Sequence, residues 1–237
     1  MRINEYTAVS TKKVLLVPYS AHHVPKYHEW MKDPDIQEAT ASEPLTLDEE
    51  YAMQRSWRVD ADKLTFIICR PEHNQPMTRD GRLDPDSMIG DVNLFISTAE
   101  DDAENQVVAG ELELMIAERT EQRRGYGRAA LLAFLNYILR HEGSLLTEFY
   151  AGQPTATAVA PARFGHFAVK IGETNHRSIA LFERLGFHKT SATPSYFGEF
   201  ELRLGRDEIQ SFLNPSSSTG GSLEGYMEIE YSCPQGA

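Results

Sequence analysis

The feature that most constrains this chain is a short unit of strand, turn and helix between residues 110 and 141. The run "GELELMIA" alternates apolar and polar side chains, as a strand does, and "AALLAFLNYILRH" is apolar enough for a buried helix. Between them lies "EQRRGYGR", residues 121–128, with two glycines and three arginines. The turn therefore opens a helix, and its composition needs an explanation in a chain that is otherwise acidic.

We interpret this turn as a cradle for an anion. Gly125 and Gly127 remove side chains where backbone N–H groups converge, and the helix dipole makes that end positive. Arg123, Arg124 and Arg128 add full charges. A plain tight turn would use the same glycines. A Walker loop is excluded because no Gly-Lys-Ser/Thr follows, and the dinucleotide fingerprint lacks its third glycine. A pyrophosphate is the anion that such a turn can hold.

The net charge of the chain limits the kinds of molecule that it is expected to bind. The 237 residues carry a formal net charge of -12, which repels a nucleic-acid backbone or an anionic membrane and favours a cationic partner such as an amine. An RNA-binding arginine-glycine element would need an extended basic repeat, which this sequence lacks. With only Cys69 and Cys233, neither a disulfide framework nor a cysteine zinc site is expected.

The same composition predicts a soluble cytoplasmic protein without a metal. The first residues lack the apolar run of a secretion signal, and no segment reaches the roughly 18 apolar residues of a membrane helix. Two cysteines fit a reducing compartment. The eight histidines show no spacing that would make two of them metal ligands.

Hydrophobic spacing places helices and strands along one domain, residues 1–205. Helices are expected within 21–34 and from 46 to about 60, the second with Thr46 and Glu49 as a capping box. Strands at 63–70 and 87–97 are expected to pair as a hairpin. Stretches at about 71–87 and 142–164 are interpreted as insertions, and residues 206–237 as a linker-like tail.

Two motifs together point to a family. The pattern Gln-x-x-Gly-x-Gly at 122–127 and the later "NHRSIALFERLGF" resemble the two halves of the acetyl-CoA site in the GNAT superfamily of N-acetyltransferases. The stretches "HHVPKYHEWM", "IGDVNLF" and "KIGETNHRSIALFERLGF" are similar to the N-acetyltransferase 9-like proteins, over roughly residues 2–204. This resemblance implies an α/β fold: a mixed twisted sheet with helices on both faces, and two strands that splay apart to admit the cofactor.

The resemblance also assigns the cofactor and its contacts. Acetyl-CoA would be the co-substrate, with its pantetheine arm along the strand near Met115, Ile116 and Ala117. The turn of Arg123, Arg124, Gly125, Tyr126, Gly127 and Arg128 would hold the pyrophosphate, and Asn175 would contact the cofactor from the other strand. Many relatives protonate the leaving thiolate with a tyrosine where this chain has Phe182. Tyr196 is a candidate substitute, and the alternative is that the thiolate leaves without help.

Aminolysis of a thioester also needs a base for the amine proton. Glu111 and Glu113 alternate with leucines and so share one face of the strand beside the cofactor groove. Glu111 is the favoured base or water relay, with Glu113 as electrostatic support; a solvated strand face is the alternative for either. Glu43, in a loop that the family fold places near the acceptor groove, is a candidate for binding a peptide's positive N-terminus.

These expectations converge on an acetyl-CoA-dependent N-acetyltransferase. An α-amine with a pKa near 8 is far more often neutral at pH 7 than a lysine side chain, so the N-terminus of a protein or peptide is the favoured acceptor. Relatives have been linked to tubulin N-termini, which makes tubulin a possible partner. A small molecule or a lysine is the alternative acceptor. A non-catalytic acyl-CoA-binding scaffold is the rival from another class, with Phe182 in its favour and the two glutamates against it.

Overall fold

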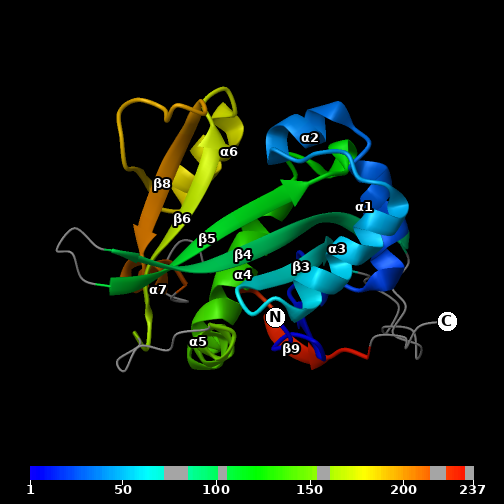
Figure 1. Ribbon diagram of the computed structural model, residues 1–237, viewed down its shortest axis with the longest axis horizontal. Coiled ribbons are helices and arrows are strands. Elements are labelled where there is room, and N and C mark those ends of the chain that lie inside the picture. The colour runs from blue at the N-terminus through cyan, green and yellow to red at the C-terminus, as the bar shows by residue number, and fades with distance from the viewer. Residues whose placement is uncertain (72–84, 101–105, 154–160, 214–222, 233–237) are drawn as a thin grey trace.

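The fold is built on one mixed sheet, whose strand order places the first and the last strand side by side at one edge. The computed structural model describes residues 1–71, 85–100, 106–153, 161–213 and 223–232. Within them the strand order is β7-β8-β6-β5-β4-β3-β2-β1-β9, and all pairs are antiparallel except β5 with β6 (Figure 1). The strands are Thr7–Ser10 (β1), Leu15–Pro18 (β2), Lys63–Cys69 (β3), Met88–Glu100 (β4), Gln106–Ile116 (β5), Phe164–Gly172 (β6), His188–Lys189 (β7), Glu199–Gly205 (β8) and Met227–Glu230 (β9).

Helices cover both faces of the sheet. They are Val24–Trp30 (α1), Pro34–Thr40 (α2), Leu47–Val59 (α3), Tyr126–Arg140 (α4), Glu142–Ala151 (α5), His176–Arg184 (α6) and Arg206–Leu213 (α7). Helices α1 and α3 cover one face of β2 and β3, whereas α4 lies behind the sheet in the view of Figure 1. Two apolar clusters result, the larger one with α4 to α7 and the smaller one with α1 and α3. The predicted α/β fold with helices on both faces is confirmed.

The strands β5 and β6 separate at the centre of the sheet. Their parallel pairs begin at Val108 with Phe164 and end at Glu111 with Ala168, although β5 continues to Ile116 and β6 to Gly172. The last five residues of β5 therefore have one edge that is not paired with β6. This is the splayed geometry that the family resemblance implies.

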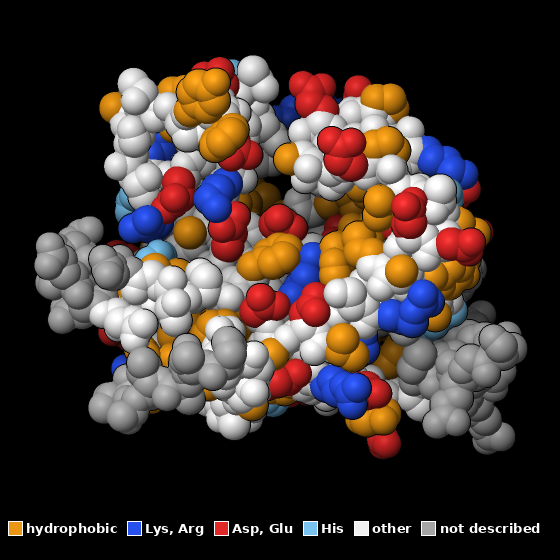
Figure 2. Space-filling view, in the orientation of Figure 1, with side chains coloured by type: hydrophobic (Ala, Val, Ile, Leu, Met, Phe, Trp, Pro, Cys, Tyr) orange, Lys and Arg blue, Asp and Glu red, His pale blue; other side chains and the backbone are white. Residues whose placement is uncertain are grey.

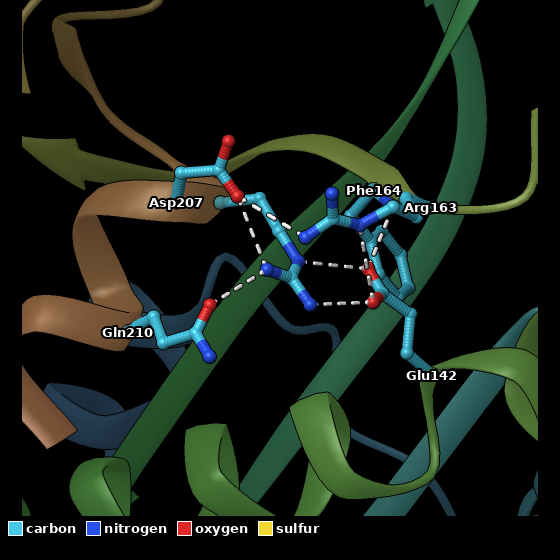
Figure 3. A network of polar contacts seen from close by, with 6 residues as sticks. Glu142, Arg163, Phe164, Asp207 and Gln210 are labelled. Atoms are coloured by element: carbon cyan, nitrogen blue, oxygen red, sulfur yellow. Dashed lines mark hydrogen bonds and ion pairs between the residues drawn. The ribbon is translucent and has the colours of Figure 1, made fainter. Parts of the chain in front are cut away.

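The C-terminal part of the chain differs from the expectation of a linker-like tail. Helix α7 follows β8 directly, and Arg206 at its start pairs with the buried carboxylate of Glu142 at 2.9 Å (Figure 3). Glu142 also accepts a hydrogen bond from the backbone N–H of Phe164. Further on, β9 pairs with β1 along its four residues. The described part of 206–237 thus belongs to the fold, and the polar, glycine-rich residues around it concealed the short strand.

The proposed insertion at 142–164 is also different in its described part. Residues 142–151 form the helix α5, whose Leu145, Leu146 and Phe149 are buried in the larger apolar cluster. Leu146 and Phe149 lie one and four positions after Leu145 and share a helical face with it, but the surrounding Gly and Thr weakened the periodic signal. Residues 154–160, and residues 72–84 of the other proposed insertion, lie outside the described part.

Several local predictions are confirmed. The capping box of α3 is present, with Thr46 and Glu49 bonded to each other's backbone N–H. Strands β3 and β4 pair as the expected hairpin. The strand β1 and the helix α2 were not predicted. Among the described residues, no helix is both long and apolar enough to cross a lipid bilayer.

Candidate active site

A row of polar side chains crosses one face of three neighbouring strands. The strand register sets Thr65 opposite Asn93 and Asn93 opposite Glu113, and opposite residues point to the same face. By the same register Lys63 and Glu111 flank Phe95 on that face. Other members of the row are Asp91 and, on β6, Lys170. These polar residues lie on a face of the sheet where apolar residues are usually buried.

Glu111 is held in an ion pair. The Nζ atom of Lys170 lies 2.7 Å from Glu111 Oε2, and this hydrogen bond raises the pKa of Lys170. Both side chains are partly exposed. The Lys170 ammonium thus occupies one oxygen of the Glu111 carboxylate, which leaves less of it free to meet an amine. Glu111 is therefore a poorer candidate for the base than the sequence suggested.

Glu113 has the environment of a proton acceptor. Solvent reaches its side chain, yet the surrounding protein atoms raise its pKa by desolvation, and the positive charge of Lys63 acts in the opposite direction. The repulsion from Glu111 adds to the rise in pKa. A carboxylate with a raised pKa binds a proton more strongly while still open to solvent. The structure thus favours Glu113 over Glu111 as the base.

Asp91 lies beneath the same face and is 2% exposed. Burial raises the pKa of its carboxyl to about 7, although hydrogen bonds from the Asn93 amide and the Tyr27 phenol oppose the rise. Asn93 also accepts a hydrogen bond from the Thr65 hydroxyl at 2.7 Å. These bonds link strands β3 and β4 and helix α1 in one polar network, which ends in a carboxyl that titrates near neutrality.

The predicted cradle lies at the start of α4. Gly125 caps the helix with φ of +83°, in the left-handed region that a residue with a side chain rarely adopts, and a Cβ there would meet nothing within 4 Å. At Gly127 a Cβ would lie 3.1 Å from Leu114 on β5, so the glycine lets the helix approach that strand. Arg123 and Arg124 are both exposed, and the Arg124 guanidinium is paired with the buried Glu121 at 2.7 Å.

The remaining residues of the cradle are less exposed than the arginine at 123. Tyr126 is buried, with the ammonium of Lys13 4.6 Å from its ring centroid, and Arg128 is half-buried in the first helical turn. The open backbone at Gly125 and the positive helix end together fit a pyrophosphate.

The predicted pantetheine contacts lie at the carboxyl end of β5, beyond its last pair with β6. Met115 and Ala117 are buried and Ile116 is half-buried. The backbone N–H of Ala117 already donates to the Ile89 carbonyl, and the Ile116 carbonyl accepts from the Gln122 amide. Because N–H groups alternate sides along a strand, the N–H groups of Ala117 and Met115 both point to β4, which leaves that of Ile116 as the candidate for a thioester.

Three other predicted residues occupy different surroundings. Asn175 caps α6, and its Oδ1 accepts a hydrogen bond from the Ser178 N–H, so its side chain is already used to stabilise that helix. Tyr196 is 98% exposed on the segment between β7 and β8, beside the exposed Phe197. Because the Tyr196 phenol is almost fully exposed, the fold does not hold it in one position over the strands. Glu43 is exposed between α2 and α3.

Phe182, at the position where many relatives have a tyrosine, is part of the hydrophobic core. Phe182 is buried on α6, and its ring meets that of Phe187 edge-on at 5.2 Å. Phenylalanine cannot donate a proton. Packing in the core is sufficient to explain an aromatic residue at this position. Within the described residues, no cluster of three His, Cys, Asp or Glu side chains is placed to hold a metal ion.

The surface is hollowed beside the open end of β5. Figure 2 shows this hollow between the part formed by β6, β8 and α6 and the part formed by α1 to α3, with acidic and basic side chains inside and below it. The cradle, the unpaired edge of β5 and the carboxylates of the polar row thus lie along one strand and the helix that follows it.

Comparison with known proteins agrees with this geometry. The family model described as "Acetyltransferase (GNAT) domain" matches residues 13–188. The chain belongs to the GNAT acetyltransferases. It is 44% identical over 205 residues to human alpha/beta-tubulin-N-acetyltransferase 9, covering 86% of each chain, and 40% identical over 231 residues to the Schizosaccharomyces pombe N-acetyltransferase 9-like protein, covering 87% of this chain and 99% of the relative. The resemblance to the N-acetyltransferase 9-like proteins is thereby confirmed.

Solved GNAT structures share the fold. A spermidine N-acetyltransferase from Vibrio cholerae in complex with CoA and spermine aligns with a TM-score of 0.58 at 13% identity, covering 84% of this chain and 98% of that one. As a GNAT acetyltransferase the chain is an acyltransferase enzyme, and acetyl-CoA is the co-substrate that fits it. Lys63, Asp91 and Lys170 were not predicted from the sequence. They lie on three different strands, and only the strand register places them on one face of the sheet.

Proposed function

We propose that this GNAT acetyltransferase transfers the acetyl group of acetyl-CoA to the N-terminal α-amine of a protein or peptide, with Glu113 as the base. The observation that carries the proposal is the place of Glu113: on the strand that leads to the cradle, just beyond the last pair of β5 with β6, and open to solvent. A cofactor held by the cradle and the open strand edge would bring its thioester past this carboxylate.

The chemistry follows from the groups present. The neutral amine attacks the thioester carbonyl carbon and forms a C–N bond, and Glu113 takes the amine proton directly or through one water. The C–S bond then breaks and its electron pair leaves on the thiolate. A thiol has a pKa near 8.5, so the thiolate needs little help from an acid. This agrees with a buried phenylalanine at position 182 and an exposed tyrosine at position 196.

Charge supports an α-amine as the acceptor. An α-amine has a pKa near 8, so roughly a tenth of it is neutral at pH 7, and a modest base is enough. The carboxylates Glu111 and Glu113 attract the protonated form of such a substrate, and Glu43 is a candidate to contact it at the α2–α3 segment. Three relatives carry alpha/beta-tubulin in their names, which makes the N-termini of α- and β-tubulin the first acceptors to test.

The base is tested by comparing Glu113→Gln with Glu111→Gln. We expect Glu113→Gln to lower kcat by about 100-fold or more, because proton transfer by a placed base contributes that much, and Glu111→Gln to lower it less. Acetyl-CoA affinity, measured by calorimetric titration, should stay the same in both. Equal small losses in both variants would contradict the role of Glu113.

The acceptor is tested with paired peptides of one sequence, taken from the tubulin N-termini. One peptide has a free α-amine and acetylated lysines; its partner has a blocked α-amine and free lysines. We expect mass spectrometry to find the new acetyl group on the first peptide only. Acetylation of the second peptide alone would establish a lysine acetyltransferase. Binding of acetyl-CoA without any transfer would establish a scaffold. An unchanged peptide KM in Glu43→Ala would exclude Glu43 from acceptor binding.

A further inference from the structure

Lys63 is a buried cation held between two aromatic rings. It begins β3, is 5% exposed, and its Nζ atom lies 2.9 Å from the ring centroid of Trp57 and 4.2 Å from that of Phe95. The register of β3, β4 and β5 points its side chain to the same face as Glu113. Among the described residues, no carboxylate oxygen lies within 4 Å of this ammonium. The two rings are therefore what fixes its position.

Among the charges around Lys63, that of Glu113 has the strongest effect on its ammonium. Burial lowers the pKa of the Lys63 ammonium to about 8, and of the anions that oppose this, Glu113 acts most strongly. In return, Lys63 has the largest effect of any cation on the carboxyl of Glu113. The charged and titratable groups that face the two residues are Asp60, Asp62, Asp91, Glu111, Lys170 and Tyr27. The N-terminal ammonium of Met1, whose pKa burial lowers to about 6, also donates to the carbonyl oxygens of Lys63 and Trp57.

A purely structural role does not explain this arrangement well. An apolar side chain would fill the space between Trp57 and Phe95 without the desolvation that an ammonium suffers. A lysine at this position is useful where its charge acts on a neighbour, and its strongest anionic neighbour is Glu113. With its Nζ atom between the two rings, Lys63 forms no ion pair with that carboxylate and acts on it only through its charge.

We propose that Lys63 is a positioning residue for acetyl transfer, whose caged ammonium keeps the carboxylate of Glu113 ionised and ready to accept the proton of the acceptor amine. The proposal rests on the proposed function of Glu113. Lys63 exchanges no proton with the acceptor: the proton goes to Glu113, the C–N bond forms, and the thiolate leaves with the electrons of the C–S bond. The ammonium acts through its charge alone.

The test is the pH profile of kcat with both substrates saturating. In Lys63→Met we expect the acidic limb to move to higher pH by about 0.5 to 1 unit, because loss of a nearby positive charge favours the protonated carboxyl. The KM for acetyl-CoA should not change. Lys63→Arg keeps a charge at all pH values and should retain the acidic limb of the wild type. Lys12→Met, which removes an exposed lysine paired with Glu224, is the matched control.

A second readout does not depend on activity. Because the ammonium lies on the Trp57 ring, tryptophan emission should change as Lys63 loses its proton near pH 8, and both Lys63→Met and Lys63→Arg should lack that transition. Near-UV circular dichroism establishes that each variant is folded, and Lys63→Arg carries the test if Lys63→Met is not. An acidic limb that stays in place in a folded Lys63→Met would overturn the proposal. An acidic limb unchanged in Glu113→Gln would instead overturn the role of Glu113.

Discussion

The two faces of strands β3 to β5 have opposite chemistry. On one face Leu64, Phe66 and Ile68 of β3, with their neighbours on β4 and β5, are buried against α4. The other face carries Lys63, Thr65 and the carboxylates described above, with those of β5 open to solvent, and only Ile67 and Cys69 farther along β3 pack against α1. A sheet packed on both sides would be more stable with apolar residues on both. The polar face thus lowers the stability of the fold but provides the side chains of the candidate active site. The apolar face holds α4, and the cofactor cradle lies at the start of that helix.

The largest expected effect comes from breaking the apolar face. Phe66 is fully buried and meets Phe134 and Tyr137 edge-on at 5.9 and 5.2 Å. We expect Phe66→Ala to lower the free energy of unfolding by about 3–5 kcal/mol, as large cavities in a core do. Urea denaturation measures this. The neighbouring Thr65→Val, on the polar face, is the matched variant, and it should cost clearly less. Equal losses would mean that the two faces contribute alike to stability.

The next effect concerns the polar face and depends on pH. The carboxyl of Asp91 has a pKa of about 7 in the fold and an ordinary value of 3.8 in the unfolded chain, so the folded state binds the proton more strongly between these values. Stability must therefore fall as pH rises through this window, by about 4 kcal/mol at most for a shift of this size from 3.8 to about 7.

Asp91→Asn tests this directly. The variant should show a flatter dependence of unfolding free energy on pH between 4 and 7 than the wild type, measured by urea denaturation at each pH. Asp48→Asn, at an exposed position of α3, is the control and should follow the wild type. A wild type and an Asp91→Asn variant with the same slope would show that Asp91 is ionised in the fold across this range.

The cradle gives a smaller effect that separates cofactor binding from the polar face. We expect Gly125→Glu to weaken acetyl-CoA binding at least about tenfold, because the side chain brings negative charge to the positive helix start. Calorimetric titration measures this. Gly125→Asn, which tolerates φ of +83°, should keep most of the affinity. Gly143→Glu adds the same charge on α5, where a Cβ also meets nothing within 4 Å. A loss of affinity in Gly143→Glu as large as in Gly125→Glu would contradict a local cradle.

The contrast between the faces also explains what the sequence could predict. Local signals were sufficient for the turn at 121–128, the capping box at Thr46 and the alternation of Glu111 and Glu113, because each lies within a few residues. The cluster of Lys63, Asp91 and Glu113 was not predictable, since it depends on which residues of three strands are opposite. The same reason applies to β9, whose partner β1 is more than 200 residues away in the chain.

Predicted roles changed where a nearby group had already engaged the residue. Glu111 fits the pattern of a base as well as Glu113 does, and two features separate them: the Lys170 ammonium 2.7 Å from Glu111 and the desolvation that raises the pKa of Glu113. Asn175 fits a cofactor contact, and its bond to Ser178 shows what its side chain does in the fold. Sequence spacing thus indicates which residues can reach a site, whereas the choice among them depends on neighbours from distant segments.

The smallest predicted effect tests whether α3 acts only as a cover for the polar face. Its capping box joins Thr46 and Glu49, and we expect Thr46→Ala to lower the free energy of unfolding by about 1 kcal/mol. Trp57 lies near the other end of this helix, more than two turns from the cap, so the cage around Lys63 should persist. The pH profile of kcat should therefore match the wild type. Ser42→Ala, outside the helix, is the control for stability. A shifted acidic limb in Thr46→Ala would mean that the position of the cage, and with it the charge acting on Glu113, depends on the whole length of α3.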